Sequence, residues 1–143
     1  ADRAEERSLF AEAEKQLAVV LRARPSDPAA LNNLAWVYLQ RNDPRARPLA
    51  QKAYLLNPSA ESADTLGWIL VSTGNPQTGL TLLKQALATL GRDPTVVYHY
   101  AVALKETGRT EDAVKMLKAI VDSIAEFDDR PAATKLLAEL TKG

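Results

Sequence analysis

The chain has 143 residues, of which 46% are hydrophobic and 25% charged, a composition typical of one globular domain. Its 18 basic and 18 acidic residues cancel, which argues against a nucleic-acid partner because nucleic-acid-binding domains usually carry a basic excess. Cysteine is absent, which excludes disulfides, thiolate metal sites and a cysteine nucleophile. No run of 18 or more apolar residues occurs, so we expect no direct membrane insertion by this segment.

The first predicted helix covers residues 9–23, which the charged residues 1–7 either extend or leave frayed, and it carries an apolar stripe. The stripe is Ala13, Leu17 and Val20, whose i, i+4, i+7 spacing places three side chains on one helical face. It returns three times, at intervals of 33, 33 and 34 residues, which predicts a stack of repeats. The later copies are Ala46-Ala50-Ala53, Gly79-Leu83-Ala86 and Ala113-Leu117-Ile120.

A second motif precedes each of these later copies and predicts a partner helix. Its copies are Leu34-Ala35-x-x-Tyr38, Leu66-Gly67-x-x-Leu70 and Tyr100-Ala101-x-x-Leu104. The two motifs are separated by Asn42-Asp43-Pro44, Gly74-Asn75-Pro76 and Gly108-Arg109-Thr110. Glycine and asparagine most readily adopt the left-handed conformation that ends a helix, so each unit is predicted to be a helix–turn–helix. The small residues of the second motif should let two helix backbones approach closely.

This order of motifs resembles the tetratricopeptide repeat, over nearly the whole chain. The resemblance implies an all-α, right-handed α-solenoid of antiparallel helix pairs, with a C-terminal capping helix. We expect one domain over 1–143, made of a half repeat (8–25), three repeats (28–59, 60–93 and 94–125) and a capping helix (129–142). Leu70 and Leu104 replace the usual tyrosine and Gly79 the usual alanine, but each remains apolar or small.

The two ends of the array differ. The half repeat leaves one side of its helix uncovered, which makes it a candidate self-association site. At the other end, Asp129 precedes a proline-led helix and is predicted to cap it, while Ala133, Leu136, Leu137 and Leu140 form one apolar face. Such a final helix shields the end of a repeat array.

Three segments also resemble the C-terminal end of bacterial repeat lipoproteins of exopolysaccharide and PEP-CTERM systems. They are Leu31–Trp36, Asp64–Leu70 and Tyr98–Ala101, together with the closing apolar face of the last helix. This resemblance implies an exported scaffold in the periplasm or anchored to the outer membrane by a lipid outside this segment. A cytoplasmic location remains an alternative.

Catalytic chemistry finds little support in the residue pattern. His99 is the one histidine, so any Ser-His-Asp arrangement would need it. It lies in the slot that Asn33 and Thr65 hold in other repeats, and we predict a half-exposed helix residue there. No metal-ligand set and no glycine-rich cofactor loop is present, so we predict no enzyme, no metal and no cofactor.

In this repeat family the first helices line a concave groove, and ligands usually bind there. The resemblance therefore places in the groove the residues Asn32, Trp36, Leu39, Gln40, Asp64, Trp68, Val71, Ser72, Tyr98, Val102 and Lys105. Trp36 and Trp68 occupy equivalent slots, and two interpretations stay open: anchors for a bound peptide, or indoles that pack as core. The cations of the carboxylate-clamping subclass are missing, so binding of a chaperone tail is not expected.

We therefore predict a non-catalytic scaffold whose concave groove holds a peptide or protein partner, in a bacterial secretion or exopolysaccharide-export assembly. The alternative is a structural spacer, or a self-associating segment of a longer array. An enzyme with a hidden site around His99 is a third alternative.

Overall fold

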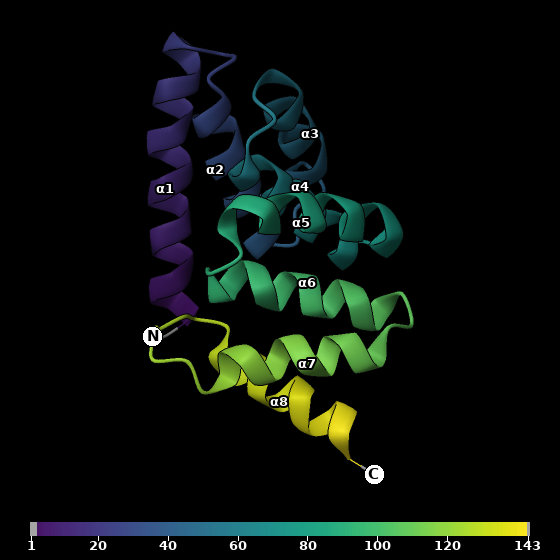
Figure 1. Cartoon of the computed structure of the whole chain (residues 1–143). Helices are drawn as coiled ribbons and strands as arrows, with labels where there is room; N and C mark the ends of the chain where they lie inside the picture. The colour runs from purple at the N-terminus through teal and green to yellow at the C-terminus, as the bar shows by residue number, and fades with distance from the viewer. Residues whose placement is uncertain (1–2, 143) are drawn as a thin grey trace.

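The computed structural model describes residues 3–142, and within them the chain forms eight α-helices and no strand. The helices are α1 (Arg3–Ala23), α2 (Pro28–Gln40), α3 (Ala46–Leu56), α4 (Ala60–Ser72), α5 (Pro76–Leu90), α6 (Pro94–Glu106), α7 (Thr110–Val121) and α8 (Arg130–Thr141). Each helix packs on the next in chain order, and the stack turns from the upright α1 to the crosswise α6 and α7 (Figure 1). The predicted all-α helical-repeat fold is confirmed.

The turns inside the repeats use the predicted residues. Asn42, Gly74 and Gly108 all have positive φ, at 55°, 95° and 83°. Each therefore takes the left-handed conformation that lets the first helix end and the second reverse direction. At Gly74 and Gly108 a Cβ would meet no atom within 4 Å, so glycine is needed there for its backbone freedom.

A second pair of glycines has a different purpose, the close approach of α4 and α5. A Cβ on Gly79 would lie 2.6 Å from the carbonyl oxygen of Gly67, and one on Gly67 would lie 2.9 Å from Cγ of Leu83. Real Cβ atoms do not approach other heavy atoms so closely, which means that only glycine fits at this crossing. The predicted role of small residues at the helix crossing is confirmed at Gly67.

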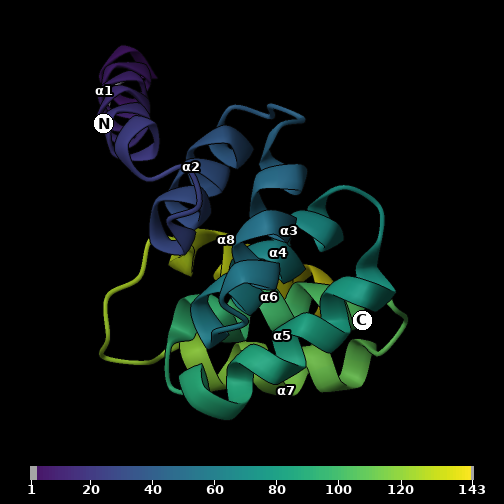
Figure 2. The same ribbon diagram turned by 90° about the horizontal axis from the view of Figure 1, so that it is seen from above.

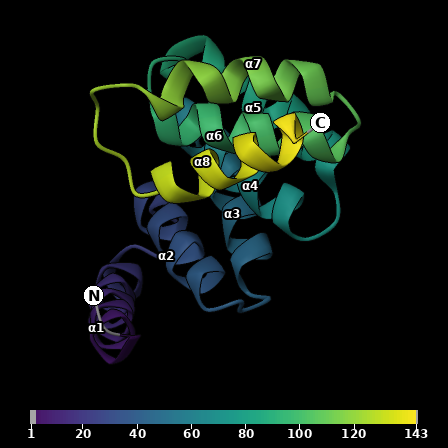
Figure 3. The same ribbon diagram turned by 90° about the horizontal axis from the view of Figure 1, so that it is seen from below.

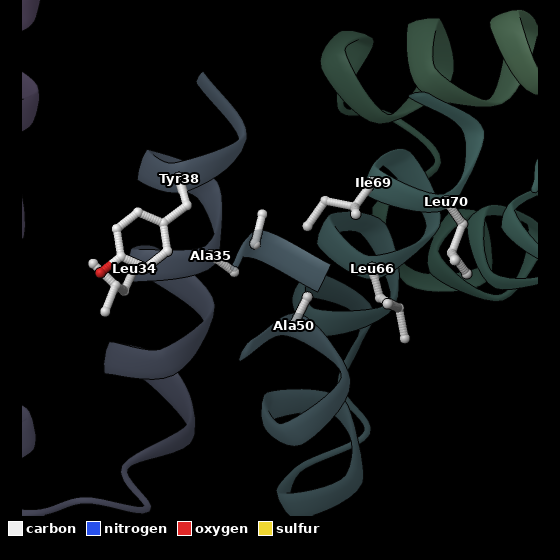
Figure 4. Close-up of a cluster of buried hydrophobic side chains, with 8 residues drawn as sticks. Leu34, Ala35, Tyr38, Ala50, Leu66, Ile69 and Leu70 are labelled. Carbon is white, nitrogen blue, oxygen red and sulfur yellow. The ribbon is translucent and has the colours of Figure 1, made fainter. Parts of the chain in front are cut away.

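The core is a series of overlapping clusters of buried side chains along the stack. Figure 4 shows the first cluster, where Ala35 of α2 faces Ala50 of α3 and Leu66, Ile69 and Leu70 come from α4. The alanines lie between larger side chains, so the helices come close without leaving voids. Each cluster joins three or four successive helices, so stability depends on stacking one unit on the next.

The N-terminal helix is longer and less covered than the repeat pattern predicted. It begins at Arg3 instead of residue 9, and none of its residues is buried. Figures 2 and 3, which view the stack from above and below, show α1 standing at its edge beside α2. An ion pair joins Arg41, at the end of α2, to Glu14 of α1.

Candidate functional site

The first helices of the repeats form one continuous layer. Besides packing on its own second helix, α4 also contacts α2 on one side and α6 on the other. In a curved two-layer stack the inner layer is the one whose members touch each other, so this is the layer that the sequence predicted to carry a groove. The equivalent slots of this layer hold Trp36, Trp68 and Val102, and all three are half-buried.

Four aromatic rings from three first helices converge on this layer. Trp68 of α4 stacks on His99 of α6, with ring centroids 4.3 Å apart and planes inclined by 16°. Trp36 of α2 reaches the same imidazole at 6.0 Å, and Tyr98 lies 5.9 Å from Trp68. These separations are within the range of favourable aromatic pairs. The two indoles therefore pack against protein on one side and keep part of their surface exposed.

His99 lies beneath these rings, and its predicted half-exposed position is wrong. Only 1% of its surface is exposed, and its Nδ1 lies 2.8 Å from Oδ1 of Asp64 on α4. Because a carboxylate only accepts, Nδ1 carries the proton of this bond. Indoles from two preceding helices cover the ring, which spacing within one repeat does not reveal. Thr65, its equivalent in the second repeat, is buried as well.

A second carboxylate interacts electrostatically with His99, and no lysine or arginine among the described residues pairs with it. Asp129, just before α8, is half-buried, and burial is the main reason that its pKa is raised. The negative charges of Asp128 and Asp64 raise this pKa further, and only His99 opposes them. Burial also raises the pKa of Tyr98, to which the charge of Asp129 adds. Asp129 and Asp64 thus give this part of the inner layer a local negative charge that a cation would relieve.

The predicted capping role of Asp129 is also wrong, since its side chain makes no hydrogen bond to the start of α8. Asp27, in the matching position before α2, does bond to the backbone N–H groups of Ala29 and Ala30. Two features differ: the backbone of Asp27 is extended, with ψ 110°, whereas Asp129 has ψ 3°, and the prolines stand at different positions. Pro28 is the first residue of its helix, whereas Pro131 is the second and removes an N–H that a capping side chain would bind.

The other predicted groove residues fall into separate places. Val71 is a correction: it is only 8% exposed and packs against Gly79 of α5, in a buried cluster that extends to α6 and α7. Leu39 and Ser72 line a hollow beside the α2–α3 turn. Gln40 lines another hollow between α1 and the end of α2. These positions lie at the turn end of the first helices, away from the aromatic cluster.

Tyr98, Val102 and Lys105 line a hollow of about 270 Å³ between α6 and α8, opposite Lys135, Leu136 and Glu139. Asn32 lies in a hollow with Ser59 and Glu61 at the start of α4, and its Oδ1 is buried without a hydrogen-bond partner. The predicted set is therefore split among several hollows, with Trp36, Asp64, Trp68 and Tyr98 brought together in the middle.

The sequence pattern did not predict that α1 forms one wall of the site. Trp36 lines a hollow of about 450 Å³, mostly apolar, between α1 and α2. The other lining residues are Ala13, Gln16, Leu17, Val20, Asn33 and Val37. The sequence did contain a signal for this wall, because a half repeat lacks one of its partner helices and so leaves its apolar stripe partly uncovered.

The described residues give little support for metal binding, membrane insertion or histidine chemistry. Across residues 3–142, no group of three or more His, Cys, Asp or Glu residues is arranged to hold a metal ion. Within the same range, no helix combines the length and apolar character needed to cross a membrane. His99 is covered by rings, and its Nδ1 is engaged by Asp64.

These features define a class of protein: an array of helix pairs whose inner layer offers side chains to a partner. Two family models, each described as a tetratricopeptide repeat, match residues 1–63 and 70–140. The chain belongs to the tetratricopeptide-repeat family, whose members generally act as scaffolds for protein interactions. No curated protein matches the chain.

Several solved structures share this fold. MamA matches with a TM-score of 0.70 and 21% identity, over 96% of this chain and 82% of its own. YrrB, described as a TPR protein with an unusual peptide-binding site, gives 0.68 and 19%, over 97% and 74%. A putative kinesin light chain of Podospora anserina, with nearly identical TPR-like repeats, gives 0.72 and 18%, over 98% and 81%. At these identities the similarity shows the fold alone.

Proposed function

We propose that this chain is a non-catalytic scaffold module that binds a segment of a partner protein along its first helices. One observation carries the proposal. Trp36 and Trp68 stand in equivalent slots of consecutive repeats, remain partly exposed, and converge on one buried imidazole. Half-exposed indoles held rigid by neighbouring rings lose little entropy on binding, which suits them as anchors for a partner. The peptide-binding site attributed to YrrB, a protein of similar fold, is consistent with this proposal.

The charges favour a partner segment that carries a lysine or arginine beside apolar residues. Asp64 is engaged by the imidazole of His99, and no lysine or arginine among residues 3–142 forms an ion pair with Asp64 or Asp129. Aromatic faces next to two carboxylates attract a cation both through the ring quadrupole and through charge. Lys105 and Glu106, farther along α6, pair with each other and leave this preference unchanged.

We further propose that the partner belongs to a bacterial envelope assembly for secretion or exopolysaccharide export. The support is the resemblance of the Leu31–Trp36, Asp64–Leu70 and Tyr98–Ala101 segments to repeat lipoproteins of such systems. Fractionation of a bacterial host that carries the parent gene would test this, with recovery in the cytosol alone as the contrary result.

The binding proposal is tested with Trp36→Ala combined with Trp68→Ala. Tryptophan fluorescence is a direct probe, because the chain holds two tryptophans and both lie at the site. We expect titration with a panel of peptides to shift the wild-type emission most for those that carry a lysine or arginine next to a leucine. Immobilised on a surface, the double variant should bind these peptides at least about tenfold more weakly.

The matched control is Leu55→Ala with Leu56→Ala, at the exposed end of α3. It should bind the peptides as the wild type does, while circular dichroism shows that all three proteins are helical. Equal binding by wild type and tryptophan variant would contradict the proposal. Unfolding of the tryptophan variant would instead show that the indoles act as core, and Trp36→Phe with Trp68→Phe would then test the anchor role.

A second candidate function is self-association as a spacer or assembling segment. The observation that favours it is the apolar surface left open on α1, where Leu9 and Val19 are 68% and 60% exposed. Apolar side chains gathered on an otherwise charged helix commonly mark an interface.

A further inference from the structure

One side of α1 carries a stripe of three apolar residues and one glutamine that residues 3–142 leave partly open. Its members are Leu9, Ala13, Gln16 and Val20, whose spacing of four, three and four residues keeps them on one helical face. Leu9 is 68% and Val20 38% exposed. Three of the four members also line the 450 Å³ hollow between α1 and α2. The open surface therefore has the shape of a binding groove for one more helix.

The rest of the chain shows what covers such a stripe. Ala13, Leu17 and Val20 are the first copy of a pattern that recurs on α3, α5 and α7. In each later copy all three members are buried, because a helix packs on each side of the helix that carries them. On α1 the same pattern has only α2 beside it, and no member is buried. The chemistry of the missing cover is thus an amphipathic helix with an apolar stripe.

The charges of α1 favour a second α1 as that helix. Residues 3–14 contain four glutamates and two arginines, whereas residues 15–24 contain three basic residues and no acidic one. Two copies in antiparallel orientation bring the acidic half of each helix against the basic half of the other. Glu6 and Arg24 are 18 residues apart, which is five full helical turns, so they lie on the same side of the helix and would meet across such a pair. The backbone continues the helix as far as Arg24, whose N–H bonds to the carbonyl of Val20.

We propose that two copies of this chain form a two-fold symmetric dimer in which each α1 lies in the hollow between α1 and α2 of the other copy. Leu9 packs against Val20 of the partner subunit, and Glu6 pairs with Arg24 of the partner subunit. The interface is a four-helix bundle of α1, α2 and their symmetry mates, and a symmetric contact of this kind closes at two copies. The inference rests on the second candidate function, self-association, and specifies how the two copies pack.

The first test is the mass in solution, by size exclusion with light scattering over a wide concentration range. We expect the mass to rise from that of one 15.6 kDa chain to twice that value and to stop there. Val20→Glu should raise the dimer dissociation constant at least about a hundredfold, because a charge would be buried without a partner. Leu55→Glu, at a more exposed leucine on α3, should leave the dimer unchanged. Circular dichroism checks that both variants fold.

The absence of cysteine makes cross-linking a sharp second test. A mixture of Leu9→Cys and Val20→Cys chains should form a disulfide-linked dimer on oxidation. Either variant alone should cross-link at least about tenfold more slowly, since positions 9 and 20 of one helix are about 16 Å apart and equal positions of an antiparallel pair stay beyond disulfide reach. Glu6→Arg and Arg24→Glu should each weaken the dimer, and the double reversal should restore it.

A mass of one chain at every concentration would overturn the proposal, as would growth beyond two chains or equal association of wild type and Val20→Glu. These outcomes are distinct from failure of the peptide-binding proposal. Peptide binding by the tryptophan variants is measured at protein concentrations below the dimer dissociation constant. Association of Val20→Glu is measured from its mass in solution, without peptide.

Discussion

His99 on α6 donates a hydrogen bond from Nδ1 to Oδ1 of Asp64 on α4 across 2.8 Å, and this bond joins two consecutive repeats beneath a stacked indole. The two residues are 35 positions apart, one more than the offset between His99 and its equivalent, Thr65. The contact therefore depends on how neighbouring first helices are shifted along their axes. A buried polar side chain with a fixed partner specifies how the helices sit more tightly than apolar packing does. The positions of the aromatic rings at the site therefore depend on this hydrogen bond.

His99→Ala should destabilise the fold by about 2–4 kcal/mol, because it removes a buried ring and leaves Asp64 without its partner. His99→Asn keeps a donor on a shorter side chain and should cost less. Urea denaturation followed by circular dichroism measures both. In a double-mutant cycle with Asp64→Ala, a coupling energy near zero would show that the hydrogen bond adds nothing to packing.

Gly79→Ala should destabilise the protein by about 1–3 kcal/mol, because its Cβ would lie 2.6 Å from the carbonyl oxygen of Gly67 and 2.6 Å from Cγ2 of Val71. The backbone at Gly79 is helical, so the effect is steric. Gly74→Asn is the matched comparison: its φ is positive and space is free, and Asn42 holds the equivalent position in the first repeat. We expect that change to cost clearly less in thermal denaturation, and equal losses at both sites would contradict the close-approach account.

The parts of the fold that sequence predicts are those set within one repeat. Stripe spacing predicts which helix faces are buried, and the left-handed turns at Asn42 and Gly74 follow from residue type alone. The contact of Gly67 with its second helix also lies inside one unit. Such features repeat at a fixed interval, so each copy supports the others.

The site is harder to predict because it forms between repeats. Trp36 and His99 meet across two units, which requires the curvature of the whole stack. The repeat pattern gives Val71 and Lys105 equivalent positions. Val71 is nevertheless buried, because Gly79 leaves room for it, whereas Lys105 is exposed. The unpaired state of Asp129 depends on a proline displaced by one residue in the last helix.

Asp129→Asn should stabilise the protein at neutral pH. The pKa of Asp129 is raised in the fold, mainly by burial, so the folded state holds a proton more tightly than the unfolded chain does. Its contribution to stability is therefore favourable at low pH and is lost as the pH rises from the unfolded value, near 4, through the raised folded value. The gain from the substitution should be full above the raised folded pKa, fall as the pH drops towards about 4, and be absent below that. A gain that does not vary with pH in urea titrations would contradict this account.

Arg130→Ala should loosen the connection between α7 and α8. The guanidinium of Arg130 donates to the carbonyl oxygens of Val121, Ser123 and Ala125, and lies 5.0 Å over the ring of Phe127. It thus satisfies carbonyls at and beyond the end of α7 that no backbone N–H could reach, and it places a positive charge at the negative end of that helix.

We expect this substitution to cost about 1.5–3 kcal/mol and to raise amide exchange at residues 121–130 more than in α4 and α5. Arg130→Lys is the informative control, because one ammonium cannot span three carbonyls in the plane of a guanidinium and should rescue the loss only in part. Since this connection carries Asp129 to the aromatic cluster, Arg130→Ala should also reduce the pH-dependent gain of Asp129→Asn. If the two substitutions proved additive at every pH, the position of Asp129 would have to be set by α8 alone.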